Sequence, residues 1–294
     1  MFRPEASCAL VRKASPHRMP LVSLIVTTKN SRRTIAACLE SARQQDHSPI
    51  ELIVVDNHSS DGTVDVARRY ADAVIEAGWE RSAQRNVGMR AAHGEYVLIL
   101  DSDMVLDGGV VRAALEAAHG GVEAVAIPEE SFGQGFWSAC KAFERSFYTR
   151  DALVSAARFF RRQRALDIGG FDESLTGAED WDMSMRVGGA KPVAFATARI
   201  RHNEGRQTLR SLYEKKYYYG QSIPKFVRKH GKEALKRVSP LRPSLFGALA
   251  RILRHPVLTC GLMVMKATEF FGGLAGALAP GTRDPRTVYP SSDP

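Results

Sequence analysis

The sequence has few cysteines, and none of them lie close enough together to form a metal or redox motif. The four cysteines among its 294 residues are Cys8, Cys38, Cys140 and Cys260. Their wide spacing excludes a C-x-x-C zinc or thiol-exchange site and a disulfide-rich secreted scaffold. We therefore expect the protein to work in a reducing, cytoplasmic environment.

Long uncharged apolar segments are also absent. Residues 1–20 contain four Lys and Arg residues but no apolar stretch of signal-peptide length, so we expect a flexible basic arm there. Lys266 and Glu269 interrupt the most apolar segment, 257–279, which leaves it short of the roughly 18 uncharged residues of a membrane-spanning helix. The sequence thus predicts a soluble or peripherally bound protein.

Two common phosphate-binding loops are missing. The sequence contains no G-x-x-x-x-G-K-[ST] loop and no G-x-G-x-x-G motif between a predicted strand and a predicted helix. Such loops hold phosphates through backbone N–H groups at the start of a helix. Their absence argues against kinase-like enzymes and dinucleotide-dependent oxidoreductases.

The sequence does contain an alternation of apolar runs and helical periodicity from residue 21 onward. We predict strands over 21–27, 50–55, 73–75, 96–100 and 122–127, separated by helices. This pattern is typical of an α/β fold built around a mostly parallel sheet. Further along, we predict strands over 158–160 and 192–200, a helix over 178–187, and helices beyond residue 205.

Three predicted strands end in polar, acid-bearing turns, at 27–30, 56–61 and 101–103. Ligands of open α/β sheets bind beyond the carboxyl ends of the strands, so these turns form the predicted site. Two carboxylates separated by one residue, as in Asp101 and Asp103, can hold a divalent cation that bridges a diphosphate. The alternative for such a pair is a turn capped by Asp side chains.

These turns belong to a longer series of motifs. The series is Val54-Val55-Asp56, Ser59-Ser60-Asp61-Gly62-Thr63, Arg85-Asn86-Val87-Gly88, Leu100-Asp101-Ser102-Asp103, Gly169-Gly170-Phe171-Asp172-Glu173 and Glu179-Asp180-Trp181-Asp182. In order and spacing it resembles the family 2 inverting nucleotide-sugar glycosyltransferases. The resemblance covers about 21–205 and implies a GT-A-type fold, a mixed, mostly parallel sheet flanked by helices, here with a C-terminal helical extension.

The resemblance also implies which residues hold the donor. The first strand end and Asp56 would bind the base and ribose, and Asp101 and Asp103 the ribose and the metal–diphosphate. The candidate donor-binding residues are Thr27, Asn30, Asp56, Asp61, Arg85, Asp101 and Ser102. An arginine can pair with two phosphate oxygens, so Arg85 is expected to face the diphosphate, with an exposed helical position as the alternative. For Asp56 the alternative is a turn cap.

Two acids near residue 180 are the predicted catalytic residues. We assign Asp180 as the general base, because an acceptor hydroxyl needs a base within hydrogen-bond reach and neighbouring carboxylates raise its pKa. Glu179 is the predicted acceptor ligand or helper. The alternative is that both acids only stabilise the start of a helix.

The predicted cofactor is a divalent cation, Mn²⁺ or Mg²⁺. Its predicted ligands are Asp103, Asp101 and His202, the last of which we expect just after the strand at 192–200. An imidazole there would complete the metal shell in the manner of the family. The alternative for His202 is a purely structural role.

Together these residues predict inverting transfer of a single sugar from a nucleoside-diphosphate sugar to an acceptor hydroxyl. The Gln-x-x-Arg-Trp signature of processive polysaccharide synthases is absent. A lipid-linked or cell-envelope glycan precursor, such as a polyprenyl-linked sugar, is the expected acceptor. Two alternatives stay open: a metal-dependent sugar nucleotidyltransferase, and a non-catalytic nucleic-acid-binding module that stacks bases on Tyr217, Tyr218 and Tyr219. The preferred interpretation expects no nucleic acid.

The formal net charge of +9 is unevenly distributed along the chain. Residues 206–254 hold 13 Lys and Arg against two acidic residues, whereas 21–205 has an excess of acidic residues. We therefore predict a basic helical region over 206–282 that contacts an anionic membrane surface or mediates a homodimer, followed by a flexible tail over 283–294. The expected location is the inner face of the cell membrane.

Overall fold

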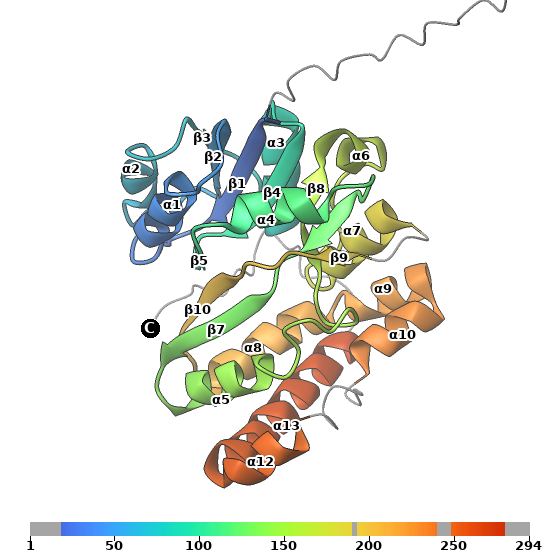
Figure 1. Ribbon diagram of the computed structural model, residues 1–294. Helices are drawn as coiled ribbons and strands as arrows, with labels where there is room; N and C mark the ends of the chain where they lie inside the picture. Colours follow the sequence, from blue (N-terminus) through green and yellow to red (C-terminus); the bar gives the residue numbers. More distant parts are fainter. Residues whose placement is uncertain (1–18, 190–192, 240–247, 280–294) are drawn as a thin grey trace, which may run out of the picture.

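The computed structural model describes residues 19–189, 193–239 and 248–279 (Figure 1). The predicted tail at 283–294, and all but the last two residues of the predicted arm at 1–20, lie outside this range. Figure 1 shows a main sheet with its helices above, and a smaller sheet with further helices below.

The main sheet has seven strands in the order β3-β2-β1-β4-β8-β6-β9. The strands are β1 (Val22–Thr28), β2 (Ile50–Asp56), β3 (Ala73–Glu76), β4 (Tyr96–Asp101), β6 (Ala124–Ala126), β8 (Ala157–Arg161) and β9 (Ala194–Phe195). β1 to β4 are parallel, and β8 runs antiparallel to both β4 and β6. The predicted mixed, mostly parallel sheet is thus confirmed.

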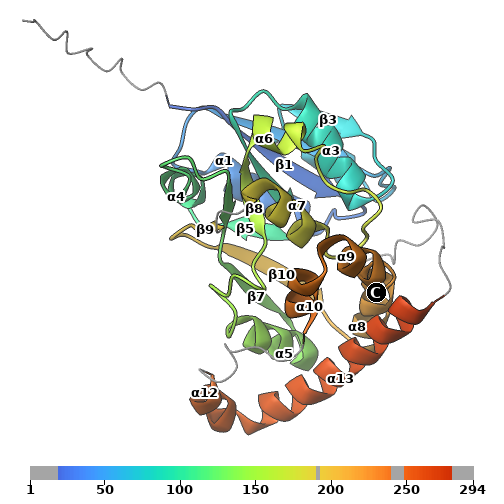
Figure 2. The same ribbon diagram turned by 90° about the vertical axis from the view of Figure 1, so that its right-hand side faces the viewer.

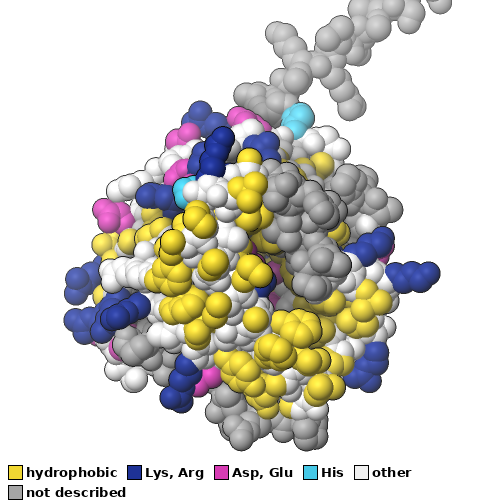
Figure 3. All heavy atoms as spheres, turned by 90° about the horizontal axis from the view of Figure 1, so that it is seen from below, with side chains coloured by type: hydrophobic (Ala, Val, Ile, Leu, Met, Phe, Trp, Pro, Cys, Tyr) yellow, Lys and Arg dark blue, Asp and Glu magenta, His cyan; other side chains and the backbone are white. Residues whose placement is uncertain are grey.

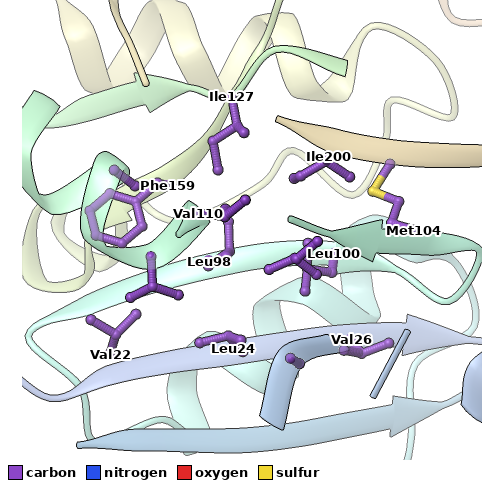
Figure 4. Packing of buried hydrophobic residues seen from close by; sticks show 14 of the residues in the cluster. Val22, Leu24, Val26, Leu98, Leu100, Met104, Val110, Ile127, Phe159 and Ile200 are labelled. Atoms are coloured by element: carbon purple, nitrogen blue, oxygen red, sulfur yellow. The ribbon is translucent and has the colours of Figure 1, made fainter. Parts of the chain in front are cut away.

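Helices cover both faces of this sheet. They are α1 (Ile35–Arg43), α2 (Thr63–Ala67), α3 (Arg81–Ala91), α4 (Val110–Ala117), α6 (Arg162–Asp167) and α7 (Glu179–Gly188). Alternate residues of β1 pack on the two faces of the sheet. Leu24 and Val26 pack with α1 and α4 (Figure 4). Ile25 packs with α3 on the other face. Every residue of β1 is buried, which explains its uninterrupted apolar sequence.

The smaller sheet joins the main sheet to the C-terminal helices. Its strands, in the order β5-β10-β7, are β5 (Met104–Leu106), β7 (Glu129–Gln134) and β10 (Ile200–Arg206). The remaining helices are α5 (Phe136–Arg145), α8 (Leu209–Gly220), α9 (Ile223–His230), α10 (Lys232–Val238), α12 (Leu249–Arg254) and α13 (Pro256–Leu278). Figure 2 shows α13 running along the lower edge of the molecule beside α5 and α8. The predicted boundary at 205–206 falls at the end of β10.

One expectation needs correction. The strand predicted over 192–200 is two strands in different sheets, so His202 lies within β10, between Met104 of β5 and Ser131 of β7. The polar sequence of β10 hid it from a search for apolar runs. By length and composition alone, α13 is long and apolar enough to cross a membrane, although Lys266 and Glu269 lie within it. Its two charges do not interrupt the helix.

Candidate active site

Three strand ends meet at one edge of the main sheet. In the parallel register Thr28 lies opposite Asp56, and Thr27 lies opposite Asp101. The Thr27 hydroxyl donates to Asp101 Oδ1 over 3.4 Å. Gln84 of α3 donates to the last carbonyl oxygen of β1 (2.9 Å) and to one near the end of β2 (2.8 Å). The structure thus brings three predicted donor-binding residues to one edge.

The turns after β1 and β2 are tied to each other. Buried Asp56 accepts hydrogen bonds from the backbone N–H (2.7 Å) and the hydroxyl (2.6 Å) of Ser59. The Asn30 N–H donates to the same hydroxyl at 2.7 Å, and Asn30 Oδ1 accepts from the Ser60 N–H at 2.9 Å. Asn30 takes a left-handed conformation, φ 48°, which asparagine tolerates better than most residues. Asp56 therefore caps its turn and fixes the loop beside the strand ends.

Asp61 and Ser102 brace the same loops. Asp61 accepts from the backbone N–H of Arg32 (3.0 Å) and from the N–H (3.0 Å) and hydroxyl (2.5 Å) of Thr63. Burial opposes the charged form, yet these hydrogen bonds lower the pKa of Asp61. The Ser102 hydroxyl donates to that of Ser31 at 2.8 Å. Both residues contribute to the shape of the predicted donor site.

Arg85 of α3 lies fully buried between the two halves of the predicted site. One terminal nitrogen donates to Asp180 Oδ1 at 2.7 Å and to Glu179 Oε1 at 3.2 Å, and the other donates to Asp101 Oδ1 at 3.0 Å. The sequence placed Arg85 against the donor diphosphate. In the structure its guanidinium instead connects the predicted donor side to the predicted acceptor side.

Asp101 faces a second buried arginine. Its Oδ2 lies 3.5 Å from a terminal nitrogen of Arg158 in β8. Burial raises the pKa of Asp101, but Arg85 and Arg158 outweigh burial and hold that pKa well below its usual range. Both oxygens of Asp101 therefore face protein cations. This leaves Asp103 as the carboxylate of the pair better suited to a metal ion.

Asp103, directly before β5, and His202, in the neighbouring strand β10, lie close together. Asp103 Oδ2 is 3.3 Å from His202 Nε2, and Asp103 Oδ1 has no hydrogen-bond partner among the described residues. Behind the ring, His202 Nδ1 is 3.6 Å from Glu129 Oε2. Burial lowers the pKa of His202, but Asp103 and Glu129 raise it to about 10. A carboxylate and an imidazole are a ligand pair that Mn²⁺ accepts. Within the described ranges, however, no three His, Cys, Asp or Glu residues gather as a complete metal site.

Glu179 and Asp180 begin α7, directly after Ala178, a non-glycine residue with φ 65°. Glu179 is 3% exposed and contacts Arg81 and Arg85, each at 3.2 Å. Burial raises the pKa of Glu179 to about 7; Asp180 adds to the rise and the two arginines oppose it. The Asp180 side chain is 25% exposed, so a ligand can reach it more readily than Glu179.

Other residues of the motif series hold the fold together. The Asn86 side chain donates to the Phe171 carbonyl at 2.9 Å and accepts from its N–H at 2.8 Å, which joins α3 to the Gly-Gly-Phe-Asp turn. The Trp181 indole donates to the Val154 carbonyl at 2.8 Å. Asp182 is buried in ion pairs with residues of α7 and α9, away from the cluster around Arg85.

Residues 23–177 match the model of the family described as Glycosyl transferase family 2. The chain belongs to this family. Its identification from sequence as a family 2, nucleotide-sugar-dependent glycosyltransferase is therefore confirmed.

This family 2 glycosyltransferase resembles two curated Escherichia coli proteins. It is 37% identical over 90 residues to the UDP-Glc:alpha-D-GlcNAc-diphosphoundecaprenol beta-1,3-glucosyltransferase WfaP, covering 29% of this chain and 36% of WfaP. It is 24% identical over 195 residues to chondroitin synthase, covering 62% of this chain and 28% of the synthase. The chain thus spans well under half of either relative.

The fold is similar to that of a solved structure, the mannosyltransferase PcManGT from Pyrobaculum calidifontis in complex with GDP-Man and Mn²⁺. The TM-score is 0.62 at 18% identity, covering 90% of this chain and 88% of that one. This likeness confirms the predicted GT-A-type fold.

Several residues of the family 2 glycosyltransferase site were missed in the sequence. Gln84, Glu129 and Arg158 all contact predicted site residues or the strand ends that carry them. Arg158 had a detectable signal, because a charged residue within the otherwise apolar start of a strand needs a buried partner. Glu129 and Gln84 had none, since both lie in ordinary polar surroundings of the sequence.

Proposed function

We propose that this family 2 glycosyltransferase transfers one sugar, with inversion, from a nucleoside-diphosphate sugar to a hydroxyl of a lipid-linked or cell-envelope glycan precursor. The observation that carries this proposal is the position of Arg85, 3.0 Å from Asp101 and 2.7 Å from Asp180. One buried guanidinium fixes the proposed ribose ligand relative to the proposed base. Direct displacement depends on such preorganised alignment of donor and acceptor.

In the proposed step Asp180 takes the proton of the acceptor hydroxyl as its oxygen bonds to the anomeric carbon. The bond from that carbon to the diphosphate breaks, and the nucleoside diphosphate leaves with the electron pair. Attack opposite the leaving group inverts the anomeric centre. The partial exposure of Asp180 supports this role. Buried Glu179 would act by holding Arg81 and Arg85 in place.

On the donor side, Thr27, Asn30 and Asp56 would bind the base and ribose, with Asp101 on the ribose. The meeting of these residues at one sheet edge supports the assignment. Asp61 and Ser102 would shape the loops rather than contact the donor directly, because each is already bonded to a neighbouring loop.

A divalent cation, Mn²⁺ or Mg²⁺, would be held by Asp103 and His202, with donor oxygens completing its shell. When bound, it offsets negative charge on the leaving diphosphate. Two observations support this site: Asp103 Oδ1 has no hydrogen-bond partner among the described residues, and the His202 imidazole lies 3.3 Å from the other oxygen of Asp103. Glu129 adds a negative charge 3.6 Å from the far nitrogen of the ring. PcManGT, solved with GDP-Man and Mn²⁺, lends further support.

A relative with a lipid-linked acceptor bears on the proposed acceptor and location. WfaP is named for a diphosphoundecaprenol-linked acceptor, which supports a polyprenyl-linked acceptor here, and such an acceptor is consistent with the proposed position at the inner face of the cell membrane. The nucleic-acid alternative loses its main argument. Tyr218 is buried and Arg81 lies 5.1 Å over the Tyr219 ring, so the three tyrosines do not form one exposed stacking surface.

A donor screen tests the proposed function. The purified full chain is titrated calorimetrically with UDP-, GDP- and dTDP-sugars with and without Mn²⁺, and the anomeric configuration of the transfer product is determined by NMR. We expect metal-dependent binding of at least one donor and a single added sugar of inverted configuration. Retained configuration or a polymeric product would contradict the proposal, and formation of a nucleotide sugar would indicate a nucleotidyltransferase.

A further inference from the structure

The outer side of α13 is an exposed, uncharged surface. The large apolar side chains exposed along it are Val257, Met263, Val264, Phe270, Phe271, Leu274 and Leu278, which we call the α13 apolar face. They recur at spacings that place them on one side of the helix. Val257 and Leu278, near its two ends, are 69% and 74% exposed. A continuous patch of this kind marks an interaction surface rather than ordinary exposure.

The opposite side of α13 is fixed to the rest of the protein by close backbone packing. A Cβ added to Gly272 would lie 2.6 Å from the Tyr213 carbonyl oxygen of α8, and one added to Gly276 would lie 2.0 Å from that of Tyr217. Only glycine permits this approach. The two helices therefore form one unit along much of their length.

The two charges of α13 pair with residues of this inner side, Glu269 from a buried position and Lys266 with a side chain that is 44% exposed. Lys141 of α5 pairs with Glu269 at 3.0 Å, and Lys266 pairs with Glu144 of α5 at 2.8 Å. Glu144 and Glu269 are 6% and 4% exposed. Pulling α13 away to cross a bilayer would leave these buried charges without partners, which is strongly unfavourable. The length of α13 therefore does not make it a spanning helix.

An apolar groove extends the face at the start of α13. It has a volume of about 470 Å³ and is lined by Phe136 and Trp137 of α5 and by Pro256, Val257, Cys260 and Val264 of α13. Exposed Arg254 of α12 lies just before it in the chain. Seen from below, this side of the molecule has hydrophobic side chains grouped together, with more Lys and Arg than Asp and Glu around the margin (Figure 3).

We propose that the α13 apolar face docks on an anionic lipid bilayer, with α13 lying in the plane of the interface. Apolar side chains would enter the boundary of the acyl chains, and the basic margin would meet anionic headgroups. Charge decides between a bilayer and a second copy of the chain. A symmetric pair would bring two basic margins together, whereas an anionic bilayer complements them.

A matched pair of substitutions tests the docking surface. Met263 on the α13 apolar face is 68% exposed, and Met19 at the start of the described chain is 52% exposed, so either can become glutamate without disturbing the core. We expect Met263→Glu to weaken co-sedimentation with phosphatidylcholine vesicles containing phosphatidylglycerol at least about tenfold, and Met19→Glu to leave it unchanged. Vesicles of phosphatidylcholine alone should bind wild type more weakly, and salt should remove that difference.

The native thiol of Cys260 reports the orientation. Cys38 and Cys140 are buried, so in a Cys8→Ser background a polarity-sensitive fluorophore attaches at exposed Cys260. We expect a blue shift on adding anionic vesicles, and release of the protein by alkaline carbonate.

Three outcomes would overturn the proposal. Equal binding of the two glutamate variants would remove the α13 apolar face as the contact. Resistance to carbonate would show a spanning helix. A dimer in solution that Met263→Glu dissociates, without vesicle binding by the wild type, would identify a second copy as the partner. Donor affinity of Met263→Glu is measured in parallel, so that a failure of docking is distinguished from a failure of the proposed sugar transfer.

Discussion

Replacing Arg85 by methionine tests whether one buried cation organises the site. The substitution leaves Asp101, Glu179 and Asp180 without the guanidinium that all three contact within 3.2 Å. Removing one partner of a buried ion pair costs about 3–5 kcal/mol, and a typical domain has about 5–15 kcal/mol of stability in total. We expect Arg85→Met to lower the free energy of unfolding by about 3 kcal/mol or more at pH 8.

The loss of unfolding free energy caused by Arg85→Met should become smaller as the pH falls. In the wild type the lowered pKa of Asp101 means that its stabilising contribution is present above about pH 4 and is lost below that. The contribution of Glu179 to stability changes with pH in the opposite direction. Because its pKa is raised, the free energy of unfolding falls as the pH rises from about 4.5 to about 7. Without Arg85, Asp101 and Glu179 each lose a cation that lowers their pKa, so protonation of these two groups at low pH relieves part of the deficit.

Urea unfolding at pH 5 and pH 8 measures both effects, with Arg112→Met as the control. Arg112 is 56% exposed and pairs with exposed Asp46, and such surface pairs contribute at most about 1 kcal/mol. An Arg85→Met loss at pH 8 no larger than that of Arg112→Met would refute the reasoning. So would a loss that is the same at both pH values.

Four further predictions concern the site and its support. Asp103→Ala should abolish the metal-dependent part of donor affinity while leaving the unfolding midpoint nearly unchanged; unchanged calorimetric affinity would remove Asp103 as a ligand. Asp180→Asn should keep donor affinity but reduce single-turnover transfer by at least about 100-fold, the usual contribution of a general base, and a near-normal rate would refute that role. The neighbouring carboxylates raise the pKa of His202 to about 10, so Mn²⁺ must displace a proton from the imidazole to bind it. The affinity for Mn²⁺ should therefore rise about tenfold per pH unit between pH 6 and 8. Calorimetric titrations in buffers of different ionisation enthalpy should show the proton release. Gly88→Ala places a Cβ 2.3 Å from Ile25 Cγ2 and should destabilise by about 1–3 kcal/mol in urea unfolding, whereas Gly108→Ala, which meets open space, should not.

The sequence alone determined the elements that carry the donor side. Runs of β-branched residues predicted the strands at 21–27, 50–55 and 96–100, and the structure has strands at Val22–Thr28, Ile50–Asp56 and Tyr96–Asp101. A strand buried on both faces is continuously apolar, and it ends where polar residues begin. The sequence therefore also indicated where the acid-bearing turns lie.

The C-terminal elements were harder to predict from sequence. β10 contains Arg201, His202, Asn203 and Glu204, and nothing in that run resembles a strand. It pairs with β5 and β7 because those edges are available in the folded chain. The charges of α13 argued against an uncharged membrane-spanning segment, and the sequence did not show that Lys141 and Glu144 of α5 neutralise them in the structure.

The partners of Arg85 were decided by tertiary structure alone. The sequence shows a helical arginine about 16 residues before Asp101 and about 94 before Glu179, and either a phosphate contact or solvent exposure was a reasonable expectation. Packing of α3 and α7 against the same sheet face buries the guanidinium fully, at the point where three carboxylates converge. Local sequence patterns report which side of one element is buried, because burial follows the period of that element. The distance between charges on separate elements depends instead on how those elements pack, and in a buried site that distance decides which charges pair.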